Sequence, residues 1–278
     1  MDGIEFDYKG YVELANLQSG DVIDVASDLM SIMSYCRKRK LDFDANKLID
    51  ALKEAVGKDG TVLIRAFSWD FCKGIEFDVK TFPSRVGSLG TIALGRRDFK
   101  RTAHPLYSWV VSGKYEQELL EYNNINGLDE KSIFSFLYEK SAKQVNLGNM
   151  ANSSLTILHY SEIMAKVPYR KEKFFEADYI TLDGKREKRK YSMHVRPFNV
   201  AVSAAPLDSE ETQNVLCESG LKAISMFDDK LKLVTYDLRA TSDFMIRDLT
   251  ENEGKLFVAI NGKNGFYTDG VDYSTAVF

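Results

Sequence analysis

The chain has 278 residues, 44% hydrophobic and 12% aromatic, which is enough for one large domain with a sizeable core. Charged residues make up 28% and the formal net charge is −4, so the molecule as a whole has no electrostatic reason to bind nucleic acid or anionic lipid. The N-terminal segment is acidic where a signal peptide is basic, and no run of about eighteen apolar residues occurs. We therefore expect a soluble cytoplasmic protein that binds small molecules and neither nucleic acid nor membranes; its oligomeric state is left open.

Short apolar runs and one amphipathic stretch organise the N-terminal part. Asp21 to Val25 is predicted to form a buried strand that ends in a polar turn. "DANKLIDALKEAV" predicts a helix that stops at Gly57. One face of this helix would carry Leu48, Ala51, Leu52 and Ala55. A second apolar strand, "TVLIRAF", follows the Asp59-Gly60 turn, and this alternation indicates the α/β class, with a central mixed sheet flanked by helices.

The middle of the chain is less regular. Residues 81–113 are rich in Gly, Ser and Arg and predict functional loops and short helices. A helix is expected at "SIFSFLYEKS" and a brief strand at "QVNLG". The next helix would begin behind the capping residues Asn152, Ser153 and Ser154, with His159 in its second turn.

The C-terminal half is predicted to be richer in strands. "ADYITLDGKREKRKYSMHV" indicates a hairpin whose Asp183-Gly184 pair favours a type I′ turn. Short strands and a helix are expected after residue 220. Because no repeat or low-complexity linker interrupts the chain, we predict a single domain over residues 1–278, with a possible smaller β-rich subdomain at about 172–240.

Two polar residues stand out in the apolar stretch "LTILHYSEIM". His159 and Glu162 are three residues apart, so their side chains can touch on one face of a helix. A neutral imidazole can accept a proton near pH 7, and a carboxylate on its other nitrogen fixes the tautomer. The pair is therefore either a general-base dyad or a buried polar pair with a structural role only.

Other common catalytic patterns are absent from the sequence. It has no GxxxxGK[ST], GxGxxG, HExxH or GxSxG motif. Its histidines, His104, His159 and His194, are far apart, and its cysteines have no CxxC spacing, so no metal site is expected. We also expect no disulfide framework. Each of the cysteines, Cys36, Cys72 and Cys217, is predicted to be structural and not a nucleophile.

Two basic segments can each be interpreted in two ways. "RRDFKRTAHPLYSW" places cations and hydroxyls beside a predicted helix start, which suits phosphate groups, but a solvated basic loop has the same composition. Lys185 to Lys190 lies on one arm of the predicted hairpin, where it would either hold a phosphate or form a solvated edge strand. Trp69 either lines a pocket that binds substrate or packs in the core.

Five blocks of the sequence resemble the aminoglycoside 3-N-acetyltransferase family in their order and approximate spacing. They are "LQSGDVIDVASDL", "VGKDGTVLIRAFS", "PSRVGSLG" with the "RR" after it, "RTAHPLYSWVVSG" and "LTILHYSE". The resemblance covers roughly residues 10–175. It implies an acetyl-coenzyme A-dependent N-acetyltransferase in which His159 is the general base, Glu162 its carboxylate partner and Thr156 a substrate contact. It also implies coenzyme contacts at Ser27, Leu29, Ser31, Ser68, Arg101, Thr102, His104 and Ser108.

The chain departs from the family pattern around the loops that would meet the coenzyme and the acceptor. The departures are Ala26, Asp28, Arg65, Asp98-Phe99 and Leu155. None of them removes the HxxE pair. We therefore predict acetyl transfer from acetyl-coenzyme A to the primary amine of an amino sugar, nucleotide-linked in view of the basic hairpin, by direct attack. The alternatives are an aminoglycoside 3-N-acetyltransferase, which would need several carboxylates facing His159, and a non-catalytic coenzyme A-binding protein.

Overall fold

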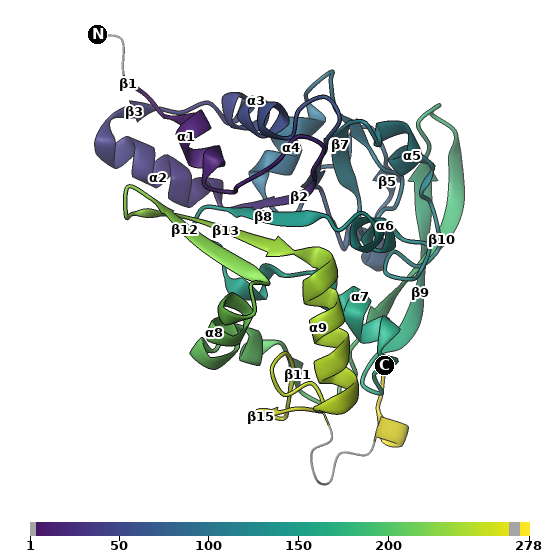
Figure 1. Cartoon of the computed structure of the whole chain (residues 1–278). Coiled ribbons are helices and arrows are strands. Elements are labelled where there is room, and N and C mark those ends of the chain that lie inside the picture. Colours follow the sequence, from purple (N-terminus) through teal and green to yellow (C-terminus); the bar gives the residue numbers. More distant parts are fainter. Residues whose placement is uncertain (1–3, 267–272) are drawn as a thin grey trace.

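A seven-stranded mixed sheet with helices on both faces forms the centre of the molecule (Figure 1). The computed structural model describes residues 4–266 and 273–278. In order across the sheet, the strands are β12 (Lys222–Phe227), β13 (Leu231–Asp237), β8 (Lys143–Leu147), β2 (Val22–Ser27), β4 (Thr61–Arg65), β7 (Trp109–Gly113) and β6 (Lys100–Arg101). Strand β2 is parallel to β8 and β4, whereas the other neighbours are antiparallel. The predicted fold class is confirmed.

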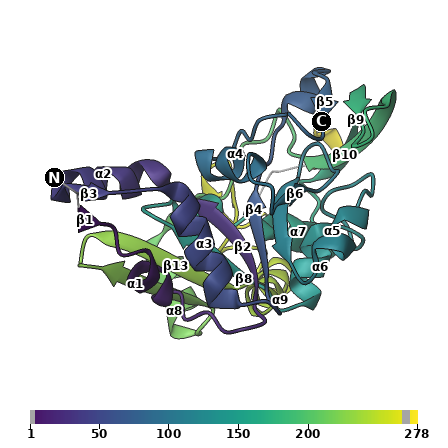
Figure 2. The same ribbon diagram turned by 90° about the horizontal axis from the view of Figure 1, so that it is seen from above.

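The helices form one layer on each face of this sheet, as the view from above also indicates (Figure 2). One layer contains α1 (Tyr8–Glu13), α2 (Leu29–Arg39), α3 (Ala45–Val56) and α4 (Ser88–Leu94). The other contains α5 (Glu116–Glu121), α6 (Ile133–Glu139), α7 (Ile157–Met164), α8 (Glu210–Glu218) and α9 (Leu238–Glu251). Strand residues alternate between the two cores: Leu63 packs in the second, and Val62 and Ile64 pack in the first. Each described helix is too short or too polar to span a membrane.

The first helices differ in part from the sequence-based expectation. Helix α3 has the predicted extent, and its buried side chains are Leu48, Ile49, Leu52 and Val56. The prediction missed α2, which starts directly after β2, where the Asp28 carboxylate accepts the Ser31 N–H at 3.1 Å. Serines, methionines and a basic end give "LMSIMSYCRKR" little apolar periodicity, so the helix is difficult to recognise locally.

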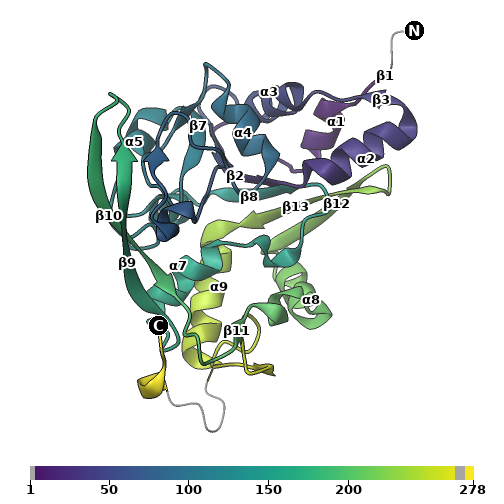
Figure 3. The same cartoon turned by 180° about the vertical axis from the view of Figure 1, so that it is seen from behind.

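A long hairpin runs along one side of the molecule (Figure 3). It pairs β9 (Lys171–Ile180) with β10 (Arg186–Val195), and β5 (Phe77–Asp78) adds to β9 in parallel. The hairpin is confirmed, but the type I′ turn is wrong. Within the turn, residues 181–185, only Gly184 has a positive φ, +85°, whereas a type I′ turn needs two such residues. Residues 182–184 form a three-residue loop instead.

The remaining strands are short. Strand β1 (Ile4–Glu5) pairs with β3 (Leu41–Asp42), and β14 (Ala259–Ile260) lies between β11 (Val202–Ser203) and β15 (Lys263–Asn264). The strands within residues 172–240 thus belong to three different sheets, because β12 and β13 pair in the central one. The β-rich subdomain stays a prediction.

The segment that leads into α7 corrects the predicted helix start. Single 3₁₀ turns occur at Asp70–Lys73, Asn152–Ser154, Ala205–Asp208 and Tyr273–Thr275. The predicted capping residues therefore form a separate turn, and Thr156 precedes α7 without a side-chain cap bond. His159 is consequently the third residue of α7 and lies in its first turn, not its second.

Candidate active site

The cavity that His159 lines lies at the edge of the sheet where parallel strands β2, β4 and β8 end. The carboxyl ends of such strands commonly form ligand sites, because the chain leaves the sheet there as loops. The cavity has a volume of about 690 Å³, which suits a small molecule, and we call it the His159 cavity. Its lining residues are Ala26, Arg65, Phe67, Trp69, Val86, Tyr107, Met150, Ser154, Thr156, His159, Arg170, Met193, His194, Val195 and Arg196.

His159 and Glu162 contact each other as predicted from their spacing. The His159 Nδ1 atom lies 2.8 Å from Oε2 of Glu162. The Glu162 side chain is 2% exposed, whereas that of His159 is 27% exposed and lines the cavity. One end of the pair is thus buried and fixed, and the other end is accessible to a ligand.

Two further side chains complete the surroundings of Glu162. Arg170, just before β9, places Nη2 at 2.8 Å from Oε2 of Glu162 and 3.0 Å from Nδ1 of His159. The Tyr169 hydroxyl donates to Oε1 at 3.0 Å. Because an ionised carboxylate only accepts hydrogen bonds, we assign the ring proton of neutral His159 to Nδ1, so the contact between Arg170 and Nδ1 is not a hydrogen bond and Arg170 donates to Glu162. The Nε2 atom of His159 then keeps a lone pair and has no hydrogen bond to the described part of the chain.

The charges in this cluster keep Glu162 ionised and His159 neutral. Burial alone would raise the pKa of Glu162, but Arg170 and His159 outweigh it and lower that pKa to about 2. Burial, followed by the charge of Arg170, lowers the pKa of His159 below its ordinary value despite the carboxylate beside it. At neutral pH the ring is therefore a proton acceptor.

A buried ion pair supports the floor of the same cavity. The Arg65 Nε atom donates to Asp24 at 3.0 Å, and Trp109 Nε1 donates to the same carboxylate at 2.9 Å. The Arg65 Nη1 atom also donates to the Ser154 carbonyl at 2.9 Å and to Thr156 Oγ1 at 3.1 Å. Arg65 thereby connects β2 and β4 to the segment that leads into α7, and it fixes the position of Thr156 in the cavity wall.

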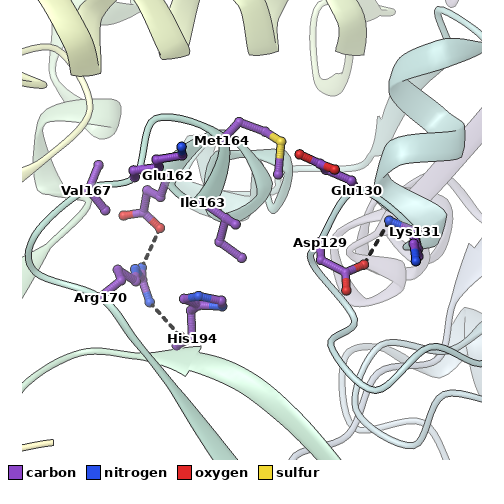
Figure 4. A pocket seen from close by; sticks show the side chains of 10 residues that line it. Asp129, Glu130, Lys131, Glu162, Ile163, Met164, Val167, Arg170 and His194 are labelled. Carbon is purple, nitrogen blue, oxygen red and sulfur yellow. Dashed lines mark hydrogen bonds and ion pairs between the residues drawn. The ribbon is translucent and has the colours of Figure 1, made fainter.

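A second cavity of about 590 Å³ lies on the other side of Arg170 and His194, and we call it the side cavity (Figure 4). Arg170 donates to the His194 carbonyl at 3.3 Å and to Glu162, so it separates the two cavities. The side cavity is also lined by Asp129, Glu130, Lys131 and Lys166. In residues 4–266 and 273–278, no group of His, Cys, Asp and Glu is suited to hold a metal ion.

Comparison with known proteins identifies the family. A family model described as aminoglycoside 3-N-acetyltransferase matches residues 25–249, most of the chain. The chain belongs to this family. The acetyl-coenzyme A-dependent N-acetyltransferase class predicted from the sequence, with acetyl-coenzyme A as cosubstrate, agrees with that membership.

Relatives within the aminoglycoside 3-N-acetyltransferase family are distant. Aminoglycoside N(3)-acetyltransferase III of Serratia marcescens is 27% identical over 190 residues, which cover 61% of this chain and 67% of that protein. Aminoglycoside N(3)-acetyltransferase IV of a Salmonella species is 28% identical over 152 residues, 54% of this chain and 55% of its own length. The chain thus spans about two thirds or less of the curated relatives that it matches.

Solved structures share the fold at lower sequence identity. The aminoglycoside acetyltransferase AAC(3)-Xa superimposes with a TM-score of 0.72 at 18% identity, covering 88% of this chain and 91% of that one. AAC-IIIb in a binary complex with CoASH gives 0.72 at 19%, covering 88% and 95%. YokD of Bacillus subtilis gives 0.70 at 21%, covering 89% and 93%. At these identities the likeness shows the fold of the family.

Five of the predicted coenzyme residues are buried and hydrogen-bonded inside the protein. They are Ser68, Arg101, Thr102, His104 and Ser108. Arg101 Nε donates to Ser108 Oγ at 3.0 Å, and Thr102 Oγ1 accepts the Trp109 N–H at 2.9 Å. His104 Nδ1 accepts two backbone N–H groups, and burial lowers its pKa to about 4. These contacts fix the loops around β7, none of the five residues lines either cavity, and their role toward the coenzyme stays a prediction.

The other predicted site residues lie nearer to the ligand space. Trp69 and Thr156 line the His159 cavity. Ser27 directly follows Ala26 of the cavity wall, whereas Leu29, at the start of α2, is buried in the core. Ser31 Oγ donates to the Asp28 carbonyl at 2.9 Å and accepts the Asn149 N–H at 3.0 Å, so it joins the start of α2 to the loop after β8. Their binding roles also stay predictions.

Three arginines of the His159 cavity were missed as site residues. Arg65 was noted only as a departure from the family pattern, and Arg170 and Arg196 flank the hairpin. An arginine in the strand "TVLIRAF" is a usable signal, because a cation in an apolar strand needs a buried partner. No local pattern relates Arg170 or Arg196 to the HxxE helix, because strand pairing brings them together.

The pH dependence of activity should depend on Arg170. Neutral His159 is required, so kcat/KM should be high above its pKa and fall as the pH drops through it, at a value below 6.5 in the unmodified protein. Arg170→Gln removes the charge that lowers this pKa, and the acidic limb should move to higher pH. Arg170→Lys keeps the charge and should shift the limb less. An unchanged limb in folded Arg170→Gln would contradict this electrostatic assignment.

Proposed function

We propose that the protein is an acetyl-coenzyme A-dependent N-acetyltransferase that acetylates a primary amine of an amino sugar by direct attack. One observation carries the proposal. The Nδ1 atom of His159 is held at 2.8 Å by the buried carboxylate of Glu162, which leaves Nε2 as a free acceptor in a cavity of small-molecule size. Family membership supports the same reaction class.

The mechanism follows from the state of the two substrates. An amine is an ammonium ion near pH 7 and cannot attack a thioester until it loses a proton. Nε2 of His159 accepts that proton and later releases it to solvent, and the amine nitrogen bonds to the acetyl carbon. As the carbon–sulfur bond breaks, the nitrogen loses its second proton, which the leaving thiolate takes up to form coenzyme A. Glu162 stabilises the imidazolium formed in between, and Arg170 limits its basicity.

An oxyanion forms during this attack and needs a hydrogen-bond donor. The Thr156 hydroxyl is suitably placed, because its oxygen accepts from Arg65 Nη1 at 3.1 Å and its own hydrogen is free to point into the cavity. Ser68 and Ser108, two of the predicted coenzyme contacts, are buried, and their hydroxyls are hydrogen-bonded within the protein. We propose Thr156 as the donor.

The comparisons favour the aminoglycoside alternative over the nucleotide-linked amino sugar, because the curated relatives are named as aminoglycoside N(3)-acetyltransferases. The basic run Lys185 to Lys190, on which the nucleotide prediction rested, does not line either cavity. Three of its five cations have ion-pair partners: Lys185 and Arg189 pair with Glu187, and Arg186 pairs with Glu76. Aminoglycosides are therefore the first acceptors to test.

The test measures thiol release from acetyl-coenzyme A in the presence of individual amino sugars and aminoglycosides. We expect release that depends on the amine and requires no cysteine. Burial raises the pKa of Cys36 and raises that of Cys72 to about 11, which disfavours the thiolate that a nucleophile needs. Turnover should therefore survive replacement of Cys36, Cys72 and Cys217 by alanine in folded protein. An acetylated cysteine that forms and decays at the rate of turnover would refute direct transfer.

A further inference from the structure

The charged residues that line the His159 cavity are all cationic. They are Arg65, Arg170 and Arg196, and no Asp or Glu is among the lining residues that the structure describes. Arg65 is balanced by Asp24 and Arg170 by Glu162, both buried behind the wall. Arg196 forms no ion pair with any residue in 4–266 or 273–278 and donates only to the Val202 carbonyl at 2.8 Å. The cavity therefore carries one uncompensated positive charge.

This charge is close to the catalytic pair. Arg196 directly follows β10, whose last residues line the cavity together with His159. Arg196 and His159 line the same cavity, although Arg196 is also exposed to solvent. Partial desolvation and the charge of Arg170 lower the pKa of Arg196, and Arg196 in turn lowers the pKa of His159. An anion beside Arg196 would relieve this repulsion.

We infer that the acceptor carries an anionic oxygen group, a carboxylate or a phosphate, which binds Arg196 while the amine reaches His159. The inference rests on the proposed function and specifies its substrate class. A guanidinium presents several N–H donors in a geometry that fits both groups. The positive wall also favours the neutral form of the amine, which is the reactive one. A compound with several ammonium groups finds no carboxylate in this wall to offset them.

Neither the coenzyme nor the side cavity supplies the negative charge that Arg196 lacks. The phosphates of coenzyme A lie at the far end of the pantetheine arm from the thioester, and the thioester must be next to His159, in the cavity that Arg196 also lines. In the side cavity, Asp129 and Glu130 are accompanied by Lys131 and Lys166, so no net negative charge faces Arg196 from there. The group that pairs with Arg196 therefore belongs to the acceptor.

The experiment compares kcat/KM for glucosamine, glucosamine 6-phosphate, muramic acid and kanamycin, in the unmodified protein and in Arg196→Gln. We expect at least one of the two anionic amino sugars to exceed both glucosamine and kanamycin by about tenfold or more, as a charge-assisted hydrogen bond would give. Arg196→Gln should remove this preference, chiefly through KM for the acceptor, without changing KM for acetyl-coenzyme A. The two anionic compounds separate phosphate from carboxylate recognition.

Arg186→Gln is the matched control, because Arg186 lies at the start of β10, the strand that Arg196 follows, pairs with Glu76 and does not line either cavity. It should keep the preference for the anionic acceptor intact.

If none of the four amines reacts, binding of inorganic phosphate to the coenzyme A complex is measured by calorimetry. Phosphate binding that Arg196→Gln does not weaken overturns the inference. Faster acetylation of kanamycin, or an equal loss for all acceptors in Arg196→Gln, overturns it too. Failure of every amine tested in the thiol-release assay would instead count against the proposed function.

Discussion

Replacing His159 with alanine is expected to lower turnover by at least about 100-fold while leaving acetyl-coenzyme A binding nearly intact. The Nε2 atom of His159 is the free proton acceptor in the cavity, and its Nδ1 is already engaged by Glu162. Without the ring, the ammonium of the acceptor has no base within reach. Steady-state kinetics would be combined with the dissociation constant for the coenzyme, because a binding defect would raise that constant instead.

Added imidazole provides a control for this variant. His159 is part of the cavity wall, so its truncation leaves space that the free base can enter. We expect imidazole to restore part of the activity, with a pH dependence that follows its own pKa. Near-normal turnover in purified His159→Ala, with the best acceptor, would remove His159 from the mechanism.

The part of the site that is local in sequence could be predicted. Because i and i+3 are neighbours on a helix, the contact between His159 and Glu162 follows from their spacing alone. The spacing does not give the protonation state of the pair. Tyr169 and Arg170 reach Glu162 only because the chain turns back after α7. Burial, followed by the charge of Arg170, reverses the simple expectation that a carboxylate raises the pKa of its histidine.

Ion pairs between residues far apart in the sequence could not be predicted. The Asp24–Arg65 pair joins adjacent parallel strands, and the register that aligns it depends on the entire sheet. The block around Arg101 and Ser108 shows a second limit of the sequence analysis. Polar residues beside a predicted loop suggested a ligand, but in the fold they bond to each other and to the Ala66 carbonyl. A buried hydrogen-bond network and a binding site have the same composition.

Regular elements were predictable where the apolar period was strong, as in α3 and the β9–β10 hairpin. They were missed where polar residues satisfy the backbone through local contacts. Helix α2 begins at the Asp28 cap, and its sequence alone has little apolar preference. The entry to α7 is set by Arg65, which holds the Ser154 carbonyl from a strand about 90 residues earlier, so no rule for helix caps could locate it.

Glu162→Gln is expected to lower the free energy of unfolding strongly and to lower turnover less than His159→Ala does. The amide can still accept the Nδ1 proton of His159, so turnover should fall less than in His159→Ala. The charge of Arg170, however, would be buried beside a neutral group, and breaking such a pair costs about 3–5 kcal/mol in the free energy of unfolding. Denaturant titration would measure this loss. Glu187→Gln, the same change in a partly exposed ion pair of the hairpin, should have little effect.

A double variant separates the loss of charge balance from the loss of shape. If an uncompensated Arg170 causes the instability of Glu162→Gln, then adding Arg170→Met should recover part of the free energy of unfolding, because an apolar side chain of similar length leaves no buried charge. Compared with Glu162→Gln alone, the double variant should also have a higher His159 pKa, because the charge of Arg170 is gone, and its acidic limb should lie at higher pH than in that single variant. Additive destabilisation by the two changes would mean that the pair is held by packing, and the electrostatic account of the site would fail with it.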